Sequence, residues 1–267
     1  MSLRSTLSEL SKLREEIQEL DASEYQCERD ENGNLSVIFF DDTVEHLPII
    51  PLRPYQLAVQ KALYLEGLNR FFLVRPRRAG KEVESWNMIL QGAVEAAGLY
   101  MQIYPTNVRA RIVLWEGSII LDDGSSLKFL DMIPKRLISA INNQDMSIRL
   151  INGSVIRVLG SDIDPDKLRG VNVRGAVFSE YAYSDPRVLH ILMPVFRQNR
   201  GWFILQTTFN GMNHAYRYMM EIKNNKDWYC RVDSVESLVD ENGVRYVNDA
   251  MIEDDRRSGM PELTRLT

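Results

Sequence analysis

The stretch Arg75-Pro76-Arg77-Arg78-Ala79-Gly80-Lys81-Glu82 decides how the rest of this sequence is interpreted. It follows the apolar run 71–74 and precedes residues 83–97, in which apolar side chains recur at helical spacing before Gly98, which we expect to cap the helix. A strand, a tight loop ending in Gly-Lys and a helix form the geometry that holds nucleotide phosphates. The sequence therefore predicts a phosphate-binding loop with Lys81 beside the β- and γ-phosphates.

This loop departs from the pattern G-x-x-x-x-G-K-[ST] at two positions. Arg75 stands where a glycine is expected, and Glu82 stands where a hydroxyl is expected. A basic turn that only faces solvent would fit the same residues equally well. Other segments of the chain must decide between the two interpretations.

Length and composition limit the class of protein. The chain has 267 residues, of which 45% are hydrophobic and 26% charged, as is typical of a soluble globular protein with one large α/β core or two modest domains. No apolar run approaches the roughly 20 residues of a membrane span, and the charged N-terminus is unlike a secretory signal. We expect a cytosolic protein without membrane contact, in which Cys27 and Cys230 are free thiols.

The net charge of −5 bears on nucleic-acid binding. Neutralisation of DNA phosphates requires clustered Lys and Arg, which an acidic chain does not offer over its whole surface. We therefore expect any grip on DNA to be local or transient. The scattered His and Cys residues have no zinc-ligand spacing.

Hydrophobic periodicity divides the chain into three parts. Residues 1–50 form an accessory layer, with an amphipathic helix over 4–20 followed by a hairpin over 25–40. Residues 51–235 alternate strands and helices, which predicts an α/β fold of the P-loop NTPase type with a central, mostly parallel sheet and antiparallel edge additions. Residues 236–267 are polar and are predicted to form a linker or tail.

The alternation within the middle part predicts strands and helices in a definite order. They are a helix over 52–65, a strand over 99–104, a helix from Thr106 to Trp115, a hairpin over 147–159, a strand over 175–180, a helix over 187–198, a strand over 202–206, a helix over 214–222 and a strand over 228–232. The turn Asn152-Gly153 identifies the hairpin, which we place as an antiparallel addition at one edge.

ATP hydrolysis needs three components that these segments can provide in part. The β- and γ-phosphates need positive charge, a Mg²⁺ ion must bind beside them, and a carboxylate must orient or deprotonate the attacking water. Lys81 and the loop amides suit the phosphates. Glu180 suits the water, because it ends a strand at the edge where such sheets bind ligands, although a solvated edge carboxylate would look the same. The predicted nucleotide-binding residues are Gln56, Arg75, Arg77, Arg78, Ala79, Gly80, Lys81 and Glu82.

The residues expected at the Mg²⁺ ion have their types exchanged. A hydroxyl usually follows the loop lysine and a carboxylate usually precedes the catalytic residue, but the chain has Glu82 and Ser179 at these positions. We hypothesise a reciprocal exchange that keeps one hydroxyl and one carboxylate near the ion. The alternative is that both residues changed independently in a weakened ATP site.

Several segments, in this order, resemble the ATPase domain of large terminase subunits, the DNA-packaging motors of tailed phages. They are 53–56, 76–82, 104–106, 168–170, 177–182 and 208–214, within a resemblance that spans about residues 50 to 235. The resemblance implies that Gln56 reads adenine, that Arg77 is the arginine typical of the loop and that Glu180 is catalytic.

The resemblance also assigns residues that link hydrolysis to movement. Thr208, with Thr207 before it, matches a motif that couples the γ-phosphate to the DNA-gripping parts, although Phe209 and Asn210 differ from the residues more usual there. Arg169 matches a catalytic arginine that reaches into the neighbouring subunit. A salt bridge that merely holds its loop is the alternative for Arg169.

The expected activity is ATP hydrolysis that drives double-stranded viral DNA into a procapsid in the host cell cytoplasm. The implied partners are DNA, a portal protein and a small terminase subunit, with a homo-oligomeric ring when the motor is assembled. We expect no DNA cleavage, because the acidic residues after Asp233 lie in a short polar segment that cannot provide a nuclease fold. A helicase-like ATPase and a nucleotide-binding scaffold with little turnover remain alternatives.

Overall fold

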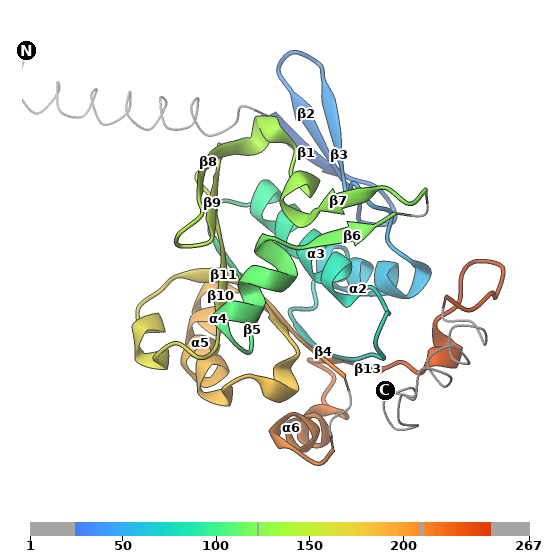
Figure 1. The fold of residues 1–267 in the computed structure, drawn as a ribbon, viewed down its shortest axis with the longest axis vertical. Helices are drawn as coiled ribbons and strands as arrows, with labels where there is room; N and C mark the ends of the chain where they lie inside the picture. Colours follow the sequence, from blue (N-terminus) through green and yellow to red (C-terminus); the bar gives the residue numbers. More distant parts are fainter. Residues whose placement is uncertain (1–24, 122, 209–210, 247–267) are drawn as a thin grey trace, which may run out of the picture.

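The computed structural model describes residues 25–121, 123–208 and 211–246, and one large sheet forms its centre (Figure 1). The strands of this sheet lie in the order β13 (Tyr229–Val232), β4 (Arg70–Val74), β12 (Trp202–Thr207), β11 (Val173–Ser179), β5 (Leu99–Tyr104), β10 (Val155–Gly160), β9 (Ser147–Leu150) and β8 (Ile138–Asn142). Neighbours from β13 to β10 are parallel, and β9 and β8 are antiparallel additions. The predicted fold class is confirmed.

The hairpin around Asn152-Gly153 is present, but only one of its strands is an edge addition. β10 pairs in parallel with β5 and antiparallel with β9. Its buried residues continue the parallel part of the sheet, and the additions are β9 and β8. The expectation that the whole hairpin lies at the edge was wrong, because a turn signal defines the pairing of its own strands and not their other neighbours.

Each face of the sheet buries its own apolar core. Side chains alternate along a strand, and in β4 Phe71 and Leu73 enter one core whereas Phe72 and Val74 enter the other. Helices α2 (Pro54–Tyr64) and α3 (Lys81–Glu95) contribute to the first core, and α5 (Pro186–Asn199) and α6 (His214–Ile222) to the second. The helices therefore cover both faces, as a parallel sheet requires.

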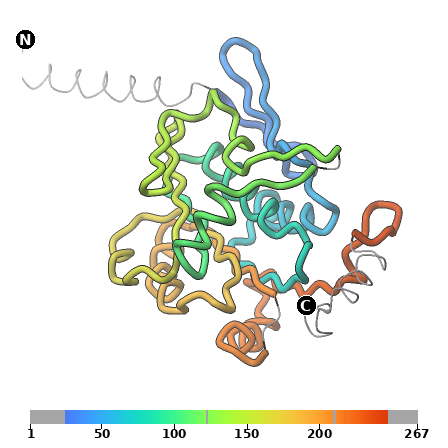
Figure 2. The backbone as a smooth tube through the Cα atoms, viewed as in Figure 1, coloured from blue at the N-terminus to red at the C-terminus, as the bar shows by residue number. Residues whose placement is uncertain are grey.

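The N-terminal layer is a three-stranded antiparallel sheet of β1 (Tyr25–Arg29), β2 (Leu35–Phe39) and β3 (Val44–Leu47). The predicted hairpin corresponds to β1 and β2, and the third strand was not anticipated. The Tyr25 hydroxyl donates to the Val94 carbonyl at 2.6 Å, which ties the layer to α3. Figure 2 shows this layer, in blue, at one end of the long axis and α6, in orange, at the other. The predicted helix over 4–20 lies outside the described residues.

The connection between β5 and β8 is more irregular than the sequence suggested. Thr106 caps α4 (Asn107–Ala110), accepting from the Arg109 amide at 3.2 Å, and a π-helical turn η1 (Arg111–Trp115) continues it as predicted. A ribbon of β6 (Ser118–Ile120) and β7 (Ser126–Lys128) follows, with 3₁₀ turns η2 (Phe129–Met132) and η3 (Lys135–Leu137). Further 3₁₀ turns are η4 (Pro165–Leu168), η5 (Tyr181–Tyr183) and η6 (Val235–Ser237).

The end of α3 differs from the prediction, whereas the state of the two cysteines agrees with it. Helix α3 ends at Glu95 with Ala96, rather than Gly98, as its cap, and the Gly98 amide instead donates to the Ser154 hydroxyl at 3.2 Å. Cys27 and Cys230 are free, as expected. Among the described helices, none has the length and apolar character needed to cross a membrane.

Residues 234–246 fold against the domain, contrary to the expectation of a linker or tail from 236 onward. Leu238 has no exposed area, and an antiparallel bridge joins Val239 to Arg245. Tyr246 packs edge to face on Tyr55 of α2, with ring centroids 5.9 Å apart. The polar composition of this segment did not indicate that it packs on the domain, because the packing depends on only a few side chains. The rest of the predicted tail lies outside the described residues.

Candidate active site

Three predicted residues meet at the carboxyl edge of the sheet. β12 lies between β4 and β11, so Thr208 after β12 falls between Lys81 and Glu180. Lys81 Nζ lies 2.9 Å from Glu180 Oε1 and also donates to Thr208 Oγ1. The Thr208 amide lies 3.3 Å from Glu180 Oε2. The structure thus joins the loop lysine, the strand-end carboxylate and the proposed coupling threonine in one cluster, and the Lys81 and Glu180 side chains are only 8% and 18% exposed.

The loop before Lys81 turns sharply into α3. Gly80 has φ +68°, and a Cβ there would lie 3.0 Å from Gln56 Nε2. Only glycine adopts this conformation without steric cost. Since the first amides of a helix have no partner within it, the start of α3 presents hydrogen-bond donors suited to an anion. Arg77 and Arg78 are exposed beside this helix start.

Gln56 supports the loop from inside. Its Nε2 donates to the carbonyls of Ala79 at 3.3 Å and Gly80 at 3.1 Å, and its Oε1 accepts from the Arg53 amide at 2.9 Å. The side chain is buried and its amide group is occupied. Adenine recognition by Gln56 stays a prediction, and it would require these bonds to break.

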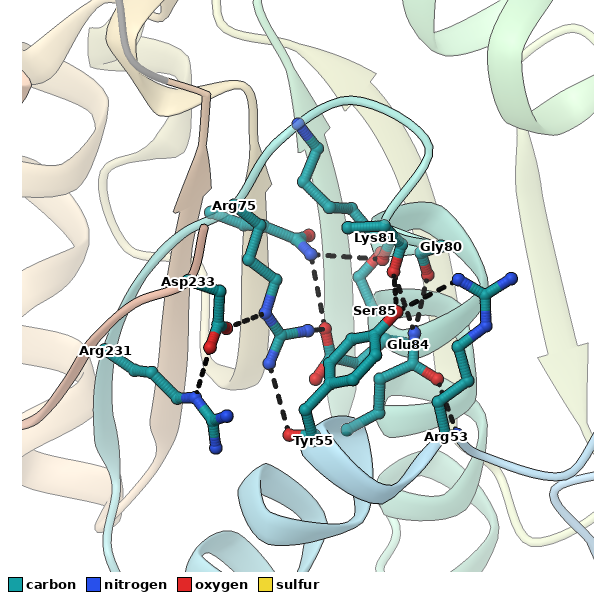
Figure 3. Close-up of polar contacts among 12 residues, drawn as sticks. Arg53, Tyr55, Arg75, Gly80, Lys81, Glu84, Ser85, Arg231 and Asp233 are labelled. Atoms are coloured by element: carbon teal, nitrogen blue, oxygen red, sulfur yellow. Dashed lines mark hydrogen bonds and ion pairs between the residues drawn. The ribbon is translucent and has the colours of Figure 1, made fainter. Parts of the chain in front are cut away.

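Arg75 is buried where β4 leads into the loop. Its side chain has no exposed area and runs away from the side chain of Lys81, toward Asp233 and Tyr55 (Figure 3). Arg75 Nε donates to Asp233 at 3.0 Å, and Nη1 contacts the carboxylate of Glu84. The Arg75 guanidinium is thus occupied by two buried carboxylates, and its predicted contact with nucleotide stays a prediction.

Glu82 and Ser179 are in direct contact, so the hydroxyl and the carboxylate of the exchange hypothesis lie side by side. Ser179 Oγ donates to Glu82 Oε1 at 2.5 Å, and the Tyr104 hydroxyl donates to Oε2. Burial raises the pKa of Glu82, the two hydroxyl donors oppose this effect, and the negative charge of Glu180 adds to it. Burial disfavours the charged form of this carboxylate, and a nearby cation would stabilise that form.

This oxygen-rich group fits Mg²⁺, which prefers carboxylate and hydroxyl oxygens. The part of the chain that the structure describes has no group of three or more His, Cys, Asp or Glu side chains placed to hold a metal. A Mg²⁺ ion at Glu82 and Ser179 would therefore draw its remaining ligands from phosphate oxygens and water, as this ion commonly does.

Glu180 has an unusual backbone conformation. Its φ is +54° and its ψ is +49°, the left-handed region that a side chain with a Cβ rarely adopts. The residue ends β11 and opens η5, where the Tyr183 amide donates to the Glu180 carbonyl at 2.9 Å. Such conformations cluster at functional sites, where the surrounding structure holds them in place.

Of the two remaining predicted residues, Thr207 lies inside the site and Arg169 lies outside it. The Thr207 hydroxyl accepts from the Ala182 amide at 3.2 Å, and the Thr207 carbonyl accepts from the Arg75 amide at 3.0 Å. Arg169 instead lies on the surface after η4 with a side chain 70% exposed, paired with Asp166 at 2.6 Å. It does not join the Lys81 cluster of its own chain.

Sequence reasoning missed Tyr104, Glu84 and Asp233. Tyr104 ends β5 and Asp233 follows β13, so both stand at the same carboxyl edge as Glu180. A polar residue at the end of each parallel strand was the available signal. Glu84 gave no comparable signal, because helical spacing does not distinguish a buried glutamate from a solvated one.

Solved structures of phage large terminases have this fold. The ATPase domain of the large terminase of Thermus phage P74-26, in a mutant form, matches with 16% identity over 82% of this chain and 93% of that chain, at a TM-score of 0.57. The large terminase of another thermophilic bacteriophage, in complex with ATP-γ-S, matches with 12% identity over 81% of this chain and 51% of that chain, at a TM-score of 0.59. The same phage protein in complex with ADP matches with 13% identity over 81% of this chain and 52% of that chain, at a TM-score of 0.55.

These matches show a shared fold at low identity. This chain corresponds to about half the length of the terminase whose ADP and ATP-γ-S complexes it matches. No protein-family model matches the sequence, and comparison with curated proteins found no match.

Proposed function

We propose that this chain hydrolyses ATP and that the hydrolysis drives double-stranded viral DNA into a procapsid. The observation that carries the proposal is the meeting of Lys81, Thr208 and Glu180 beside the start of α3. The fold supports it, because the matching structures are large terminases, two of them in complex with ADP and with ATP-γ-S.

The ion pair between Lys81 and Glu180 suggests how nucleotide would prepare the site. A γ-phosphate would replace the carboxylate as the partner of Lys81, and the loop amides would share its charge. Glu180 would then be free to accept a hydrogen bond from the attacking water. Because Thr208 contacts both side chains, it would report this change to β12, in keeping with a coupling role.

Glu82 and Ser179 are the residues proposed to hold Mg²⁺, with Tyr104 orienting the Glu82 carboxylate. The bound ion would neutralise charge on the β- and γ-phosphates. Arg169 is proposed to act on the site of a neighbouring copy in a ring, since its exposed pair with Asp166 contributes little stability and is readily given up. The proposed partners are a portal protein and a small terminase subunit. The proposed location is the host cytoplasm.

The test measures phosphate release and DNA movement together. Wild-type protein should release phosphate from ATP, Lys81→Ala should abolish release, and Lys226→Ala, at an exposed lysine, should leave it unchanged. Assembled with portal, the wild type should translocate along duplex DNA without separating its strands.

The outcomes separate the alternatives. Strand separation would favour the helicase-like ATPase. Absence of turnover at any protein concentration, with nucleotide still bound, would favour the scaffold, because a site completed by a neighbour should work faster per subunit as concentration rises.

A further inference from the structure

We propose that the segment 233–246 is part of the nucleotide site and positions the phosphate loop through Asp233 and Tyr246. The inference rests on the proposed ATPase function and adds a role for a segment outside the loop, α3 and the catalytic strand ends. The segment leaves β13, buries Leu238 and returns to α2. One of its side chains contacts the start of the loop directly, and another packs on two residues that contact the end of the loop.

Asp233 holds the beginning of the loop. Its amide donates to the Val74 carbonyl at 2.9 Å, and its Oδ2 accepts from Arg75 Nε at 3.0 Å. Its Oδ1 accepts from Arg231 Nε at 2.6 Å. The Asp233 side chain is 2% exposed, so these bonds form away from water. The residue thus fixes both the backbone and the side chain where β4 becomes the loop.

Arg75 transmits this placement to the rest of the site (Figure 3). Its Nη1 pairs with Glu84 in the first turns of α3, its Nη2 lies 3.4 Å from the Tyr55 carbonyl, and its amide donates to Thr207. One guanidinium therefore connects the loop, α2 and α3, while its backbone contacts the end of β12. A phosphate site depends on such placement, because errors of about 1 Å are costly for binding and catalysis.

Tyr246 holds the end of the loop from outside. Its ring lies 4.2 Å from the guanidinium carbon of Arg53 and packs edge to face on Tyr55. The Tyr55 hydroxyl donates to the Ala79 carbonyl at 2.7 Å, and Arg53 Nη1 lies 3.4 Å from the Arg78 carbonyl. Tyr246 therefore packs on two side chains that directly contact the loop.

The buried ion pairs of Arg75 matter more for the geometry of the loop than for the stability of the fold. A buried ion pair adds little stability over apolar residues of similar size, but removing one partner leaves the other charge uncompensated. Apolar residues cannot reproduce the directional hydrogen bonds that the Arg75 guanidinium makes. If the segment positions the loop, nucleotide binding must in turn stabilise the docked segment by the same factor.

The first experiment measures the affinity for ADP with Mg²⁺ by calorimetry, well below the thermal midpoint of each variant. Asp233→Asn should weaken binding about tenfold or more, and Tyr246→Ala several-fold. The matched controls, Asp227→Asn and Phe40→Ala at exposed positions outside the segment, should bind as the wild type does. Wild-type affinity in Asp233→Asn and Tyr246→Ala, with only the thermal midpoint lowered, would overturn the proposal.

A second variant separates positioning from folding. Arg75→Met combined with Asp233→Leu and Glu84→Gln removes the buried guanidinium together with both of its carboxylate partners, so thermal stability should recover relative to Asp233→Asn. ADP affinity should stay low in this triple variant. Recovery of both properties would show a merely structural role and overturn the proposal.

The third measurement needs no substitution. ADP should slow hydrogen exchange at the backbone amides of 233–246 in the wild type, including the Asp233 amide that donates to Val74. Unchanged exchange at saturating ADP would overturn the inference even if the variants failed to fold. Failure of the wild type to bind ADP or ATP would instead overturn the proposed ATPase function, and this inference with it.

Discussion

Glu180 combines a strained backbone with a charged side chain at the centre of the candidate site. A left-handed conformation costs a residue with a Cβ about 1 to 2 kcal/mol, and Asn or Gly would adopt it more easily. The side chain lies 2.9 Å from Lys81 and reaches the Thr208 amide. This conformation thus accompanies the placement of the carboxylate beside Lys81 and Thr208.

Glu180→Gln keeps the size of the side chain and removes its charge. We expect ATP turnover to fall about 100- to 10,000-fold, the usual contribution of a general base. Nucleotide affinity should stay the same or rise, because Lys81 is released from its ion pair. Stopped-flow phosphate release and calorimetry measure both, with Glu31→Gln at an exposed position of the N-terminal layer as the control. A matching loss of affinity would contradict the assignment.

Glu82 and Ser179 offer a test of the exchanged metal-binding pair. Glu82→Thr and Ser179→Asp should each lower Mg²⁺-dependent turnover, and the double variant should regain much of it because one hydroxyl and one carboxylate are restored. Rates at several Mg²⁺ concentrations measure the effect. Losses that simply add in the double variant would reject the exchange.

At the scale of elements, the junction between β4 and α3 is where the sequence pattern and the contacts agree. Lys81 opens α3, Gly80 supplies the left-handed turn, and Gln56 of α2 bonds the loop carbonyls. The helix places Glu84 one turn further on, facing the core. The loop is thus held by Gln56 of α2 and, through Arg75, by Glu84 of α3.

Gly80→Ala should disturb this junction specifically. The positive φ costs about 1 to 2 kcal/mol for alanine, and the new Cβ would lie 3.0 Å from Gln56 Nε2. Gly124→Ala is the matched control, since it has φ +81° and no atom within 4 Å of the new Cβ. Both variants should lose similar stability in urea unfolding, but only Gly80→Ala should lose nucleotide affinity. Equal affinity would show that the loop does not bind phosphate.

Glu84 makes stability depend on pH. Burial raises its pKa from 4.5 to about 7, against the opposing charge of Arg75. The folded state therefore holds this proton more tightly than the unfolded state, so the resulting stability is present below pH 4.5 and is lost as pH rises through 7. Urea unfolding should show the wild type losing stability relative to Glu84→Gln between about pH 5 and pH 8. A constant difference would contradict this direction.

At the scale of the whole molecule, Arg169 lies apart from the Lys81 cluster of its own chain. Arg169 lies on the surface, and its side chain pairs with Asp166 of the same turn rather than with the Lys81 cluster. That pair is exposed to water and is easily exchanged for another partner. A catalytic arginine supplied by a neighbour would connect hydrolysis to the arrangement of subunits.

Arg169→Ala should lower turnover by about 1,000-fold or more in assembled protein while nucleotide affinity is retained. The control is Arg217→Ala, at an exposed arginine of α6. Mixing Arg169→Ala with Lys81→Ala chains should restore part of the turnover, because each supplies the residue that the other lacks. Unchanged turnover in Arg169→Ala would reject the role.

The sequence by itself determined the alternation of strands and helices, the parallel sheet and the positions of Lys81 at the start of a helix and Glu180 at the end of a strand. These follow from local periodicity and from the rule that the carboxyl ends of parallel strands share one edge. Only the tertiary structure decided that Arg75 faces the core, that Gln56 supports the loop and that residues 234–246 fold back. Such contacts join residues far apart in the chain, such as Arg75 with Asp233, and their energy comes from burial and charge pairing that no local pattern records.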